Sequence, residues 1–249
     1  NTGFDNFQKA FNVNAFLGRD EVLGQYINFT LAIPKDPTIS NDKKQEIIQL
    51  AIKELDNART QNPMDPRPLM YSSLFYQTVG DSDKAIESLE SARKISPKKQ
   101  DILSNLGKLY LGKKEYDKAL SILLENFNED RAYTLARLDL AGAYVLRGEQ
   151  DKADQLLTEG FGMVDVASDF LIRSYNAVKK YDRMLGIWKV FVEQSPTNIN
   201  YRKGLAGAYL LNYQKEEAIR VLEEAVVIDP SFETEAKNYI EQIRSGKMK

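Results

Sequence analysis

Apolar and small residues recur at spacings of three and four along most of the chain, a pattern typical of helices that bury one face. The stretch from Pro66 to Lys99 holds one complete unit of this pattern. A first run ends at Gly80, because glycine commonly ends a helix, and a second run ends before Pro97, since proline cannot continue one. The positions predicted to face inward are Leu69, Ser72, Ser73, Tyr76, Ala85, Leu89 and Ala92. The unit is therefore predicted to be a hairpin of two antiparallel helices.

The same unit returns at a spacing of 34 residues. Its turn reads YQTVGDSDKAI from Tyr76, YLGKKEYDKAL from Tyr110 and YVLRGEQDKAD from Tyr144. Two later copies, YNAVKKYDRML from Tyr175 and YLLNYQKEEAI from Tyr209, follow a slip of about three residues. Gly160 and Gly162 lie at the slip and predict a shortened second helix there. Five hairpins are thus predicted over residues 66–232, with the five tyrosines packed between helices.

These repeats resemble the tetratricopeptide repeat family, whose hairpins carry a small residue and an aromatic on the first helix and alanines on the second. The resemblance covers residues 66–232 and implies an all-α fold, an α-solenoid of antiparallel helical hairpins stacked as a superhelix. Other residues replace the tryptophan often seen early in the family's first helix, namely Leu69, Leu103, Arg137, Ser168 and Leu205. The resemblance implies a scaffold that binds other proteins and is not an enzyme.

The segments on either side of the array also show helical spacing. Residues 1–65 are predicted to hold N-terminal helices and a degenerate first repeat, and residues 233–249 a capping helix. Inward positions before the array are Phe4, Phe7, Phe11, Leu23, Tyr26, Ile27, Thr30, Ala51 and Ala58, and those after it are Ala236, Ile240 and Ile243. Two prolines place a loop from Pro34 to Ser40.

Charge and composition narrow the classes of function. The 34 basic and 36 acidic residues give a net charge of −2, so we expect no nucleic-acid partner. The chain contains no cysteine and no histidine, which removes thiol nucleophiles, imidazole bases and nearly every zinc site. No motif indicates a cofactor or a metal. We expect a non-catalytic protein with no cofactor.

A stack of such hairpins leaves a concave face lined by the first helices, and faces of this kind bind peptides or partner helices. The helix phase predicts polar ligand-binding positions on this face at Arg67, Asn105, Lys108, Arg173, Asn176, Asn200 and Lys203. Apolar positions predicted on the same face are Tyr71, Leu74, Leu138 and Phe170. Arg173, Asn176, Asn200 and Lys203 fall on neighbouring first helices near the slip, which favours that region. An ordinary solvated surface is the alternative.

A second resemblance concerns about the first 80 residues, in which a GRDE turn and an NPMDPR junction follow an N-terminal helix rich in asparagine and phenylalanine. This region resembles the part that follows the last membrane helix in bacterial O-antigen ligase or polymerase-like proteins with C-terminal tetratricopeptide repeats. The resemblance, with the absence of a starting methionine, implies a soluble domain tethered to a bacterial membrane domain upstream. The alternative is a free-standing adaptor or chaperone that binds a peptide in its groove.

Overall fold

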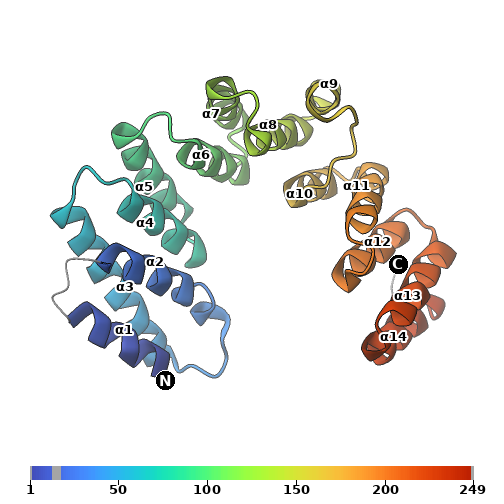
Figure 1. Cartoon of the computed structure of the whole chain (residues 1–249), viewed down its shortest axis with the longest axis horizontal. Coiled ribbons are helices and arrows are strands. Elements are labelled where there is room, and N and C mark those ends of the chain that lie inside the picture. Colours follow the sequence, from blue (N-terminus) through green and yellow to red (C-terminus); the bar gives the residue numbers. More distant parts are fainter. Residues whose placement is uncertain (1, 13–17, 248–249) are drawn as a thin grey trace. The chain divides into compact units, whose positions relative to one another are not determined.

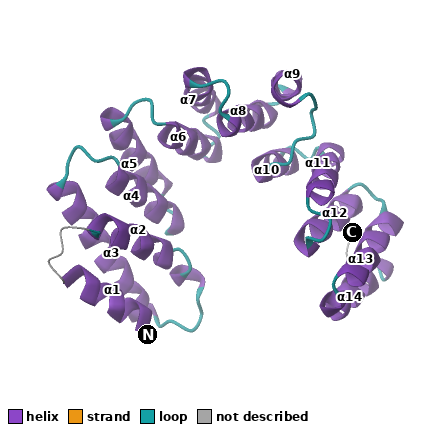
Figure 2. Ribbon diagram, viewed as in Figure 1, coloured by secondary structure: helices purple, strands orange, loops and turns teal. Residues whose placement is uncertain are grey.

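The computed structural model describes residues 2–12 and 18–247, and every regular element in these ranges is a helix (Figure 1). No strand occurs among them (Figure 2). Residues 13–17, which belong to the predicted N-terminal helical segment, lie outside the described part, as do residue 1 and residues 248–249 of the predicted cap. The all-α class and the helical hairpins predicted from the sequence are confirmed.

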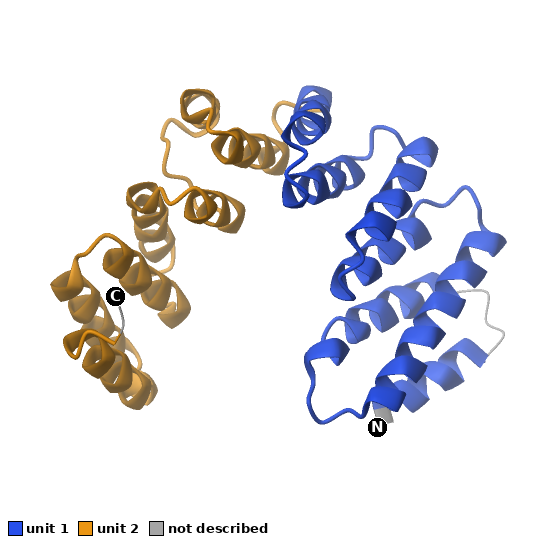
Figure 3. Ribbon diagram, turned by 180° about the vertical axis from the view of Figure 1, so that it is seen from behind, with its two compact units in different colours: residues 1–129 blue, residues 130–249 orange. Residues whose placement is uncertain are grey.

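Residue contacts group the chain into two compact units, Asn1–Glu129 and Asp130–Lys249 (Figure 3). Unit 1 contains α1 (Thr2–Asn12), α2 (Arg19–Thr30), the short 3-10 helix η1 (Ile33–Lys35), α3 (Asn41–Gln61), α4 (Arg67–Thr78), α5 (Ser82–Ile95), α6 (Gln100–Gly112) and α7 (Tyr116–Glu129). Unit 2 contains α8 (Thr134–Arg147), α9 (Gln150–Phe161), α10 (Asp169–Ala177), α11 (Tyr181–Gln194), α12 (Ile199–Leu211), α13 (Lys215–Ile228), the 3-10 helix η2 (Pro230–Phe232) and α14 (Glu233–Arg244). The segments predicted from the repeats, 1–65, 66–232 and 233–249, stay a prediction, because the units follow contacts rather than repeats.

The small residues of the repeat lie at the helix crossings. Ala85, Ala119, Ala153 and Ala218 are all fully buried near the start of a second helix. On α6, a Cβ added to Gly107 would stand 2.5 Å from the Leu123 side chain of α7. The two helices of that hairpin therefore approach closely only because position 107 has no side chain.

One turn geometry joins the two helices of every hairpin. The turn residue has a left-handed backbone in all five copies, and it is Gly80, Lys114, Gly148, Lys179 or Tyr213. The next amide donates to the carbonyl oxygen of the repeat tyrosine, as Asp81 does to Tyr76 at 2.8 Å and Gln214 to Tyr209 at 2.9 Å. This is the Schellman arrangement, which satisfies carbonyl groups that a helix end would otherwise leave unpaired.

The repeat tyrosines are less uniformly buried than the sequence predicts. Tyr175 and Tyr209 are buried, but Tyr76, Tyr110 and Tyr144 are half-buried. A basic side chain lies over all five rings. Over Tyr209 it is Lys189, at 5.7 Å, and in the other four copies it is the residue after the repeat aspartate, with the pairs Lys84–Tyr76 at 5.4 Å, Lys118–Tyr110 at 5.2 Å, Lys152–Tyr144 at 5.5 Å and Arg183–Tyr175 at 5.4 Å. The basic residue after the repeat aspartate thus covers the exposed side of the ring by a cation–π contact. In the first unit the fully enclosed aromatic is Phe75 instead.

The N-terminal helices pack as predicted. Phe4 and Phe11 of α1 are buried, and the Phe7 ring lies 5.0 Å from that of Tyr26 on α2. The Tyr26 hydroxyl donates to the Ile47 carbonyl of α3 at 2.8 Å, which pairs its polar end inside the core. The loop predicted from Pro34 to Ser40 is partly replaced by η1.

The slip in the repeat coincides with a shortened second helix, as predicted. Helix α9 has 12 residues, against 14 in α5 and α7, and Gly162 ends it with a left-handed backbone. Arg183 of α11 links α9 to the segment after it, since its Nη2 donates to Asp154 of α9 at 2.8 Å and its Nε lies 3.6 Å from Asp165. Burial raises the pKa of Asp165, and Arg183 opposes that rise.

Candidate functional site

The seven polar positions predicted for the binding face divide between the two units. Arg67, Asn105 and Lys108 lie in unit 1, on α4 and α6. Arg67 is bound to Asp65 at 2.7 Å and to Asp20 of α2 at 2.8 Å. The Asn105 amide donates to the Asp101 carbonyl one turn earlier, at 2.8 Å. Arg67 and Asn105 are exposed and Lys108 is half-buried.

The other four positions lie on α10 and α12 in unit 2. Arg173, Asn176 and Asn200 are exposed, and within the described ranges Arg173 makes no ion pair. Lys203 differs from them, because its side chain is held by three groups from the end of the chain. Its ammonium bonds to Glu235 of α14 at 2.6 Å and lies 5.8 Å and 5.9 Å from the Phe232 and Tyr239 ring centres.

Of the apolar positions predicted on this face, Leu138 is wrong, and Tyr71 and Phe170 each pack on a neighbouring helix. Leu138 is buried, with only 6% of its surface exposed. Tyr71 packs on α2, because a Cβ on Gly24 would meet its hydroxyl at 2.7 Å, and Phe170 packs on α8 in the same way at Gly142. Each of these rings therefore fills the contact between neighbouring first helices. Tyr71, Leu74 and Phe170 are all half-buried, so part of each side chain stays exposed.

A pocket of about 340 Å³ opens beside Lys203, between α12 and α14. Its wall is mainly apolar, and the lining residues are Lys203, Gly204, Ala206, Gly207, Leu210, Leu222, Tyr239 and Ile243. Lys203 is the one predicted binding residue in this lining. A volume of this size accommodates an amino-acid side chain with part of its backbone.

The charged side chains at the pocket, Lys203 and Glu235, already pair with each other. Tyr239 donates to Glu235 at 2.9 Å, so Glu235 accepts from two neighbours. Hydrogen bonds from Lys203 and then Tyr239 lower the pKa of Glu235, and the Glu235 bond raises the pKa of Lys203. Both groups are charged near neutral pH and offset each other. The pocket thus suits an apolar side chain better than a free anion.

Two glycines on α12 shape the pocket, for different reasons. A Cβ on Gly204 would lie 2.5 Å from the Trp188 ring of α11, so that glycine is required by packing. Gly207 has nothing within 4 Å of its would-be Cβ, although it lies inside the helix. Glycine there costs about 1 kcal/mol relative to alanine. No protein contact explains Gly207, and its missing side chain leaves the pocket open.

Sequence reasoning missed most of the pocket. Gly207 lies one helical turn after Lys203, so helical spacing could have indicated it. Ile243 was predicted only as an inward position of the cap, although it stands 34 residues after Tyr209. The Glu235 and Tyr239 contacts had no such signal. In unit 1 a more polar hollow of about 590 Å³ lies among α3, α4 and α5, and none of the seven predicted positions lines it. Over residues 2–12 and 18–247, no helix is long and apolar enough to cross a membrane.

Comparison with known proteins supports the repeat family and the fold. A family model described as tetratricopeptide repeat matches residues 78–125, which span α5, α6 and most of α7. A tetratricopeptide repeat protein from Parabacteroides merdae is 17% identical, with 97% of this chain and 91% of that chain covered and a TM-score of 0.60. A thermophilic protein of this repeat class from Thermus thermophilus is 20% identical over 76% of this chain and 99% of that one, with a TM-score of 0.54.

A third solved structure is PilW, described as a widely conserved type IV pilus biogenesis factor. It is 13% identical, with 84% of this chain and 94% of that chain covered and a TM-score of 0.55. At these identities the likeness establishes the solenoid fold alone. Comparison with curated proteins gives no match.

Proposed function

We propose that this chain is a non-catalytic scaffold that binds a segment of a partner protein on the first-helix face of its repeats. The repeat fold and the match over residues 78–125 support a protein-interaction role. The contact proposed as the anchor is the pocket between α12 and α14. The observation that carries it is Gly207, a helix-interior glycine whose absent side chain opens the pocket and that no packing contact requires.

The chemistry of the pocket suggests what enters it. Gly204 and Gly207 of α12 line it together with the apolar side chains of Leu210, Leu222 and Ile243. An apolar side chain of a peptide would fill it, since that removes apolar surface from water. Tyr239 and Lys203 at the rim would then face the peptide backbone. Arg173, Asn176 and Asn200 of unit 2 are proposed as further contacts along the peptide, and Arg67, Asn105 and Lys108 are proposed as ligand contacts on the first-helix face of unit 1 by itself.

A selection from a random dodecapeptide library on the purified chain tests this function. Enriched peptides are measured by fluorescence polarisation against Gly207→Leu, which fills the pocket, and Gly112→Leu, which adds the same side chain at another exposed glycine with nothing within 4 Å. We expect Gly207→Leu to weaken binding by about tenfold or more, or about 1.4 kcal/mol, and Gly112→Leu to leave it within about twofold. Equal binding by both variants, or no enriched peptide, contradicts the proposal.

The tether to a bacterial membrane domain of the O-antigen ligase or polymerase-like type is a further proposal. It rests on the resemblance of about the first 80 residues, and the glycan chemistry would then belong to another part of the protein. The alternative is a free-standing adaptor or chaperone. Fractionation of the full-length gene product separates them: sedimentation with membranes supports the tether, and a wholly soluble product rejects it while leaving the binding scaffold in place.

A further inference from the structure

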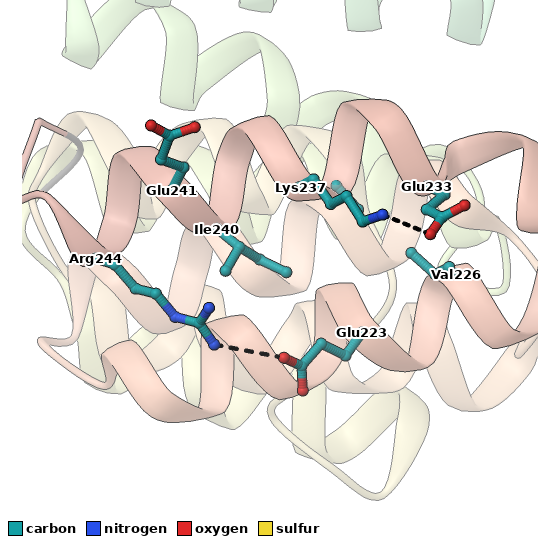
Figure 4. Close-up of a pocket in the computed structure, with 8 residues that line it drawn as sticks. Glu223, Val226, Glu233, Lys237, Ile240, Glu241 and Arg244 are labelled. Atoms are coloured by element: carbon teal, nitrogen blue, oxygen red, sulfur yellow. Dashed lines mark ion pairs between the residues drawn. The ribbon is translucent and has the colours of Figure 1, made fainter.

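A second groove, of about 430 Å³, lies between α13 and α14 (Figure 4). Its lining shares no residue with that of the peptide pocket. Val226 of α13 and Ala236 and Ile240 of α14 form its apolar part. Charged side chains surround it, and they are Glu223 of α13 and Glu233, Lys237, Glu241 and Arg244 of α14. The groove is thus a short apolar strip with a charged rim, a form that suits a helix.

The repeat pattern relates this face of α14 to the equivalent face of α12. Ile240 and Arg244 stand 34 residues after Ala206 and Leu210 of α12, and in that hairpin α13 packs on α12 and both residues are buried. Within residues 2–12 and 18–247, no second helix follows α14 to cover the equivalent face. The groove therefore lies on the face of α14 that corresponds, in the repeat pattern, to the face of α12 covered by α13.

The charges on the exposed face of α14 alternate in sign. From the start of the helix they are Glu233, Lys237, Glu241 and Arg244. If a second α14 lies antiparallel in the groove, Glu233 meets Arg244 of the second copy and Lys237 meets Glu241 of the second copy. Both pairings hold in one register to within one residue, or about 1.5 Å along the axis. A parallel in-register copy would place equal charges against each other.

We propose that the occupant of this groove is a second copy of the chain. Helix α14 of each copy lies antiparallel along the other about a two-fold axis, so that the same surface serves both sides, as closed dimers require. The present pairs, Lys237–Glu233 at 2.7 Å and Arg244–Glu223 at 3.7 Å, join side chains that are each more than half exposed. Replacing these pairs within one chain by pairs between two copies costs little free energy, because exposed ion pairs contribute little to stability.

The size of the contact sets the strength of the dimer. A helix of 12 residues is about 18 Å long, so the interface is at the small end of specific interfaces. We therefore expect a reversible dimer with a dissociation constant on the order of micromolar to tens of micromolar. The peptide pocket uses Tyr239 and Ile243 of α14, which do not line the groove, so the dimer does not depend on the proposed function.

Sedimentation equilibrium of the whole chain from about 1 to 300 µM, a range set by that affinity, tests the proposal. Glu233→Arg and Arg244→Glu each place like charges together twice in the dimer, so each variant alone should associate about tenfold more weakly or worse. An equimolar mixture of the two should dimerise again, because positions 233 and 244 then carry opposite charges at both contacts. Glu87→Arg, the same change at an exposed site on α5, serves as control and should associate like the unmodified chain.

Circular dichroism melting of each variant confirms that it is folded. A chain that stays monomeric over the whole concentration range overturns the proposal. So does self-association that the single reversals leave unchanged, since another surface would then be responsible. Failure of the mixture to recover what the single variants lose rejects the antiparallel pairing of Glu233 with Arg244.

Discussion

At the scale of single residues, the turn of the hairpin shows how one backbone geometry is kept while its residue changes. Two of the five copies use glycine, and the others use Lys114, Lys179 and Tyr213 with φ near 60°. A side chain in the left-handed region costs about 1–2 kcal/mol, because its Cβ approaches the following carbonyl oxygen. The strained copies persist because the Schellman bonds and helix packing on both sides hold the turn.

Replacing Tyr213 by glycine should therefore stabilise the chain. The Tyr213 side chain is 93% exposed, so little packing is lost. We expect a gain of about 0.5–1 kcal/mol, since the greater freedom of glycine in the unfolded chain offsets part of the relief. Urea unfolding measures this gain in the free energy of unfolding. Gly148→Ala, which creates the same strain in a copy that lacks it, should shift the midpoint in the opposite direction, and equal shifts would disprove the strain.

The same substitution should have opposite effects at two helical glycines. Gly207→Ala meets nothing and removes a poor helix former, so it should stabilise by about 1 kcal/mol. Gly107→Ala forces its Cβ to 2.5 Å from Leu123 at a helix crossing, and overpacking of about 1–3 kcal/mol should exceed the gain in helix propensity. Thermal unfolding of both variants checks the signs. A stabilised Gly107→Ala would mean that α6 and α7 separate easily.

At the scale of elements, α14 is held to α12 by one contact of mixed character. Lys203 bonds to Glu235 and lies beside the Phe232 and Tyr239 rings, while Ile243 of α14 lies with Leu210 of α12 at the apolar part of the contact. The ion pair is partly exposed, and the apolar contact is buried. Because of this division, the polar part should respond to pH and the apolar part should not.

Glu235→Gln should make the attachment of α14 less sensitive to acid. The pKa of Glu235 is lowered in the folded chain, so its contribution is present above the ordinary carboxyl pKa and is lost as the pH falls through the folded value. The original chain should melt above the variant at pH 7, and the gap should close as the pH falls from about 5 towards 3. All other carboxyl groups are the same in the original chain and in the Glu235→Gln variant, so their titration affects both melting temperatures alike. A gap of equal size at both ends of this range would exclude the ion pair as its source.

At the scale of the whole molecule, the substantial contacts within each unit join helices that are neighbours, or next but one, in the chain. Stability in such an arrangement is close to a sum of local terms, so a defect should stay near its origin. Unit 1 and unit 2 each have their own buried core.

Ile187→Ala should test how far a defect spreads. Ile187 is fully buried in α11, and the cavity should cost about 2–5 kcal/mol. Hydrogen exchange should quicken in α10 to α13 of unit 2 and stay unchanged in α2 to α5 of unit 1. Exchange that quickens equally in both units would show that the chain unfolds as a single cooperative body.

The amino-acid sequence by itself determined the helices, the five hairpins, the turn positions and the short helix at the slip. These features depend on local periodicity, on alanine at close crossings and on glycine or proline at helix ends, all of which are visible in one copy of the repeat and reinforced by the next. Phe4, Tyr26 and Ala85 were assigned correctly to the core for this reason. Helix phase also placed Lys203 beside what proved to be a pocket.

Only the tertiary structure decided which surface is available for binding. Helix phase identifies the side of a helix on which a residue lies, but the neighbour that covers that side depends on packing between helices. Tyr71 and Phe170 fill glycine gaps on adjacent helices, and Lys203 is neutralised by Glu235, 32 residues away. The pocket at Gly207 and the groove beside α14 exist because small residues leave space between helices, and space between elements is a property of their packing rather than of any one segment.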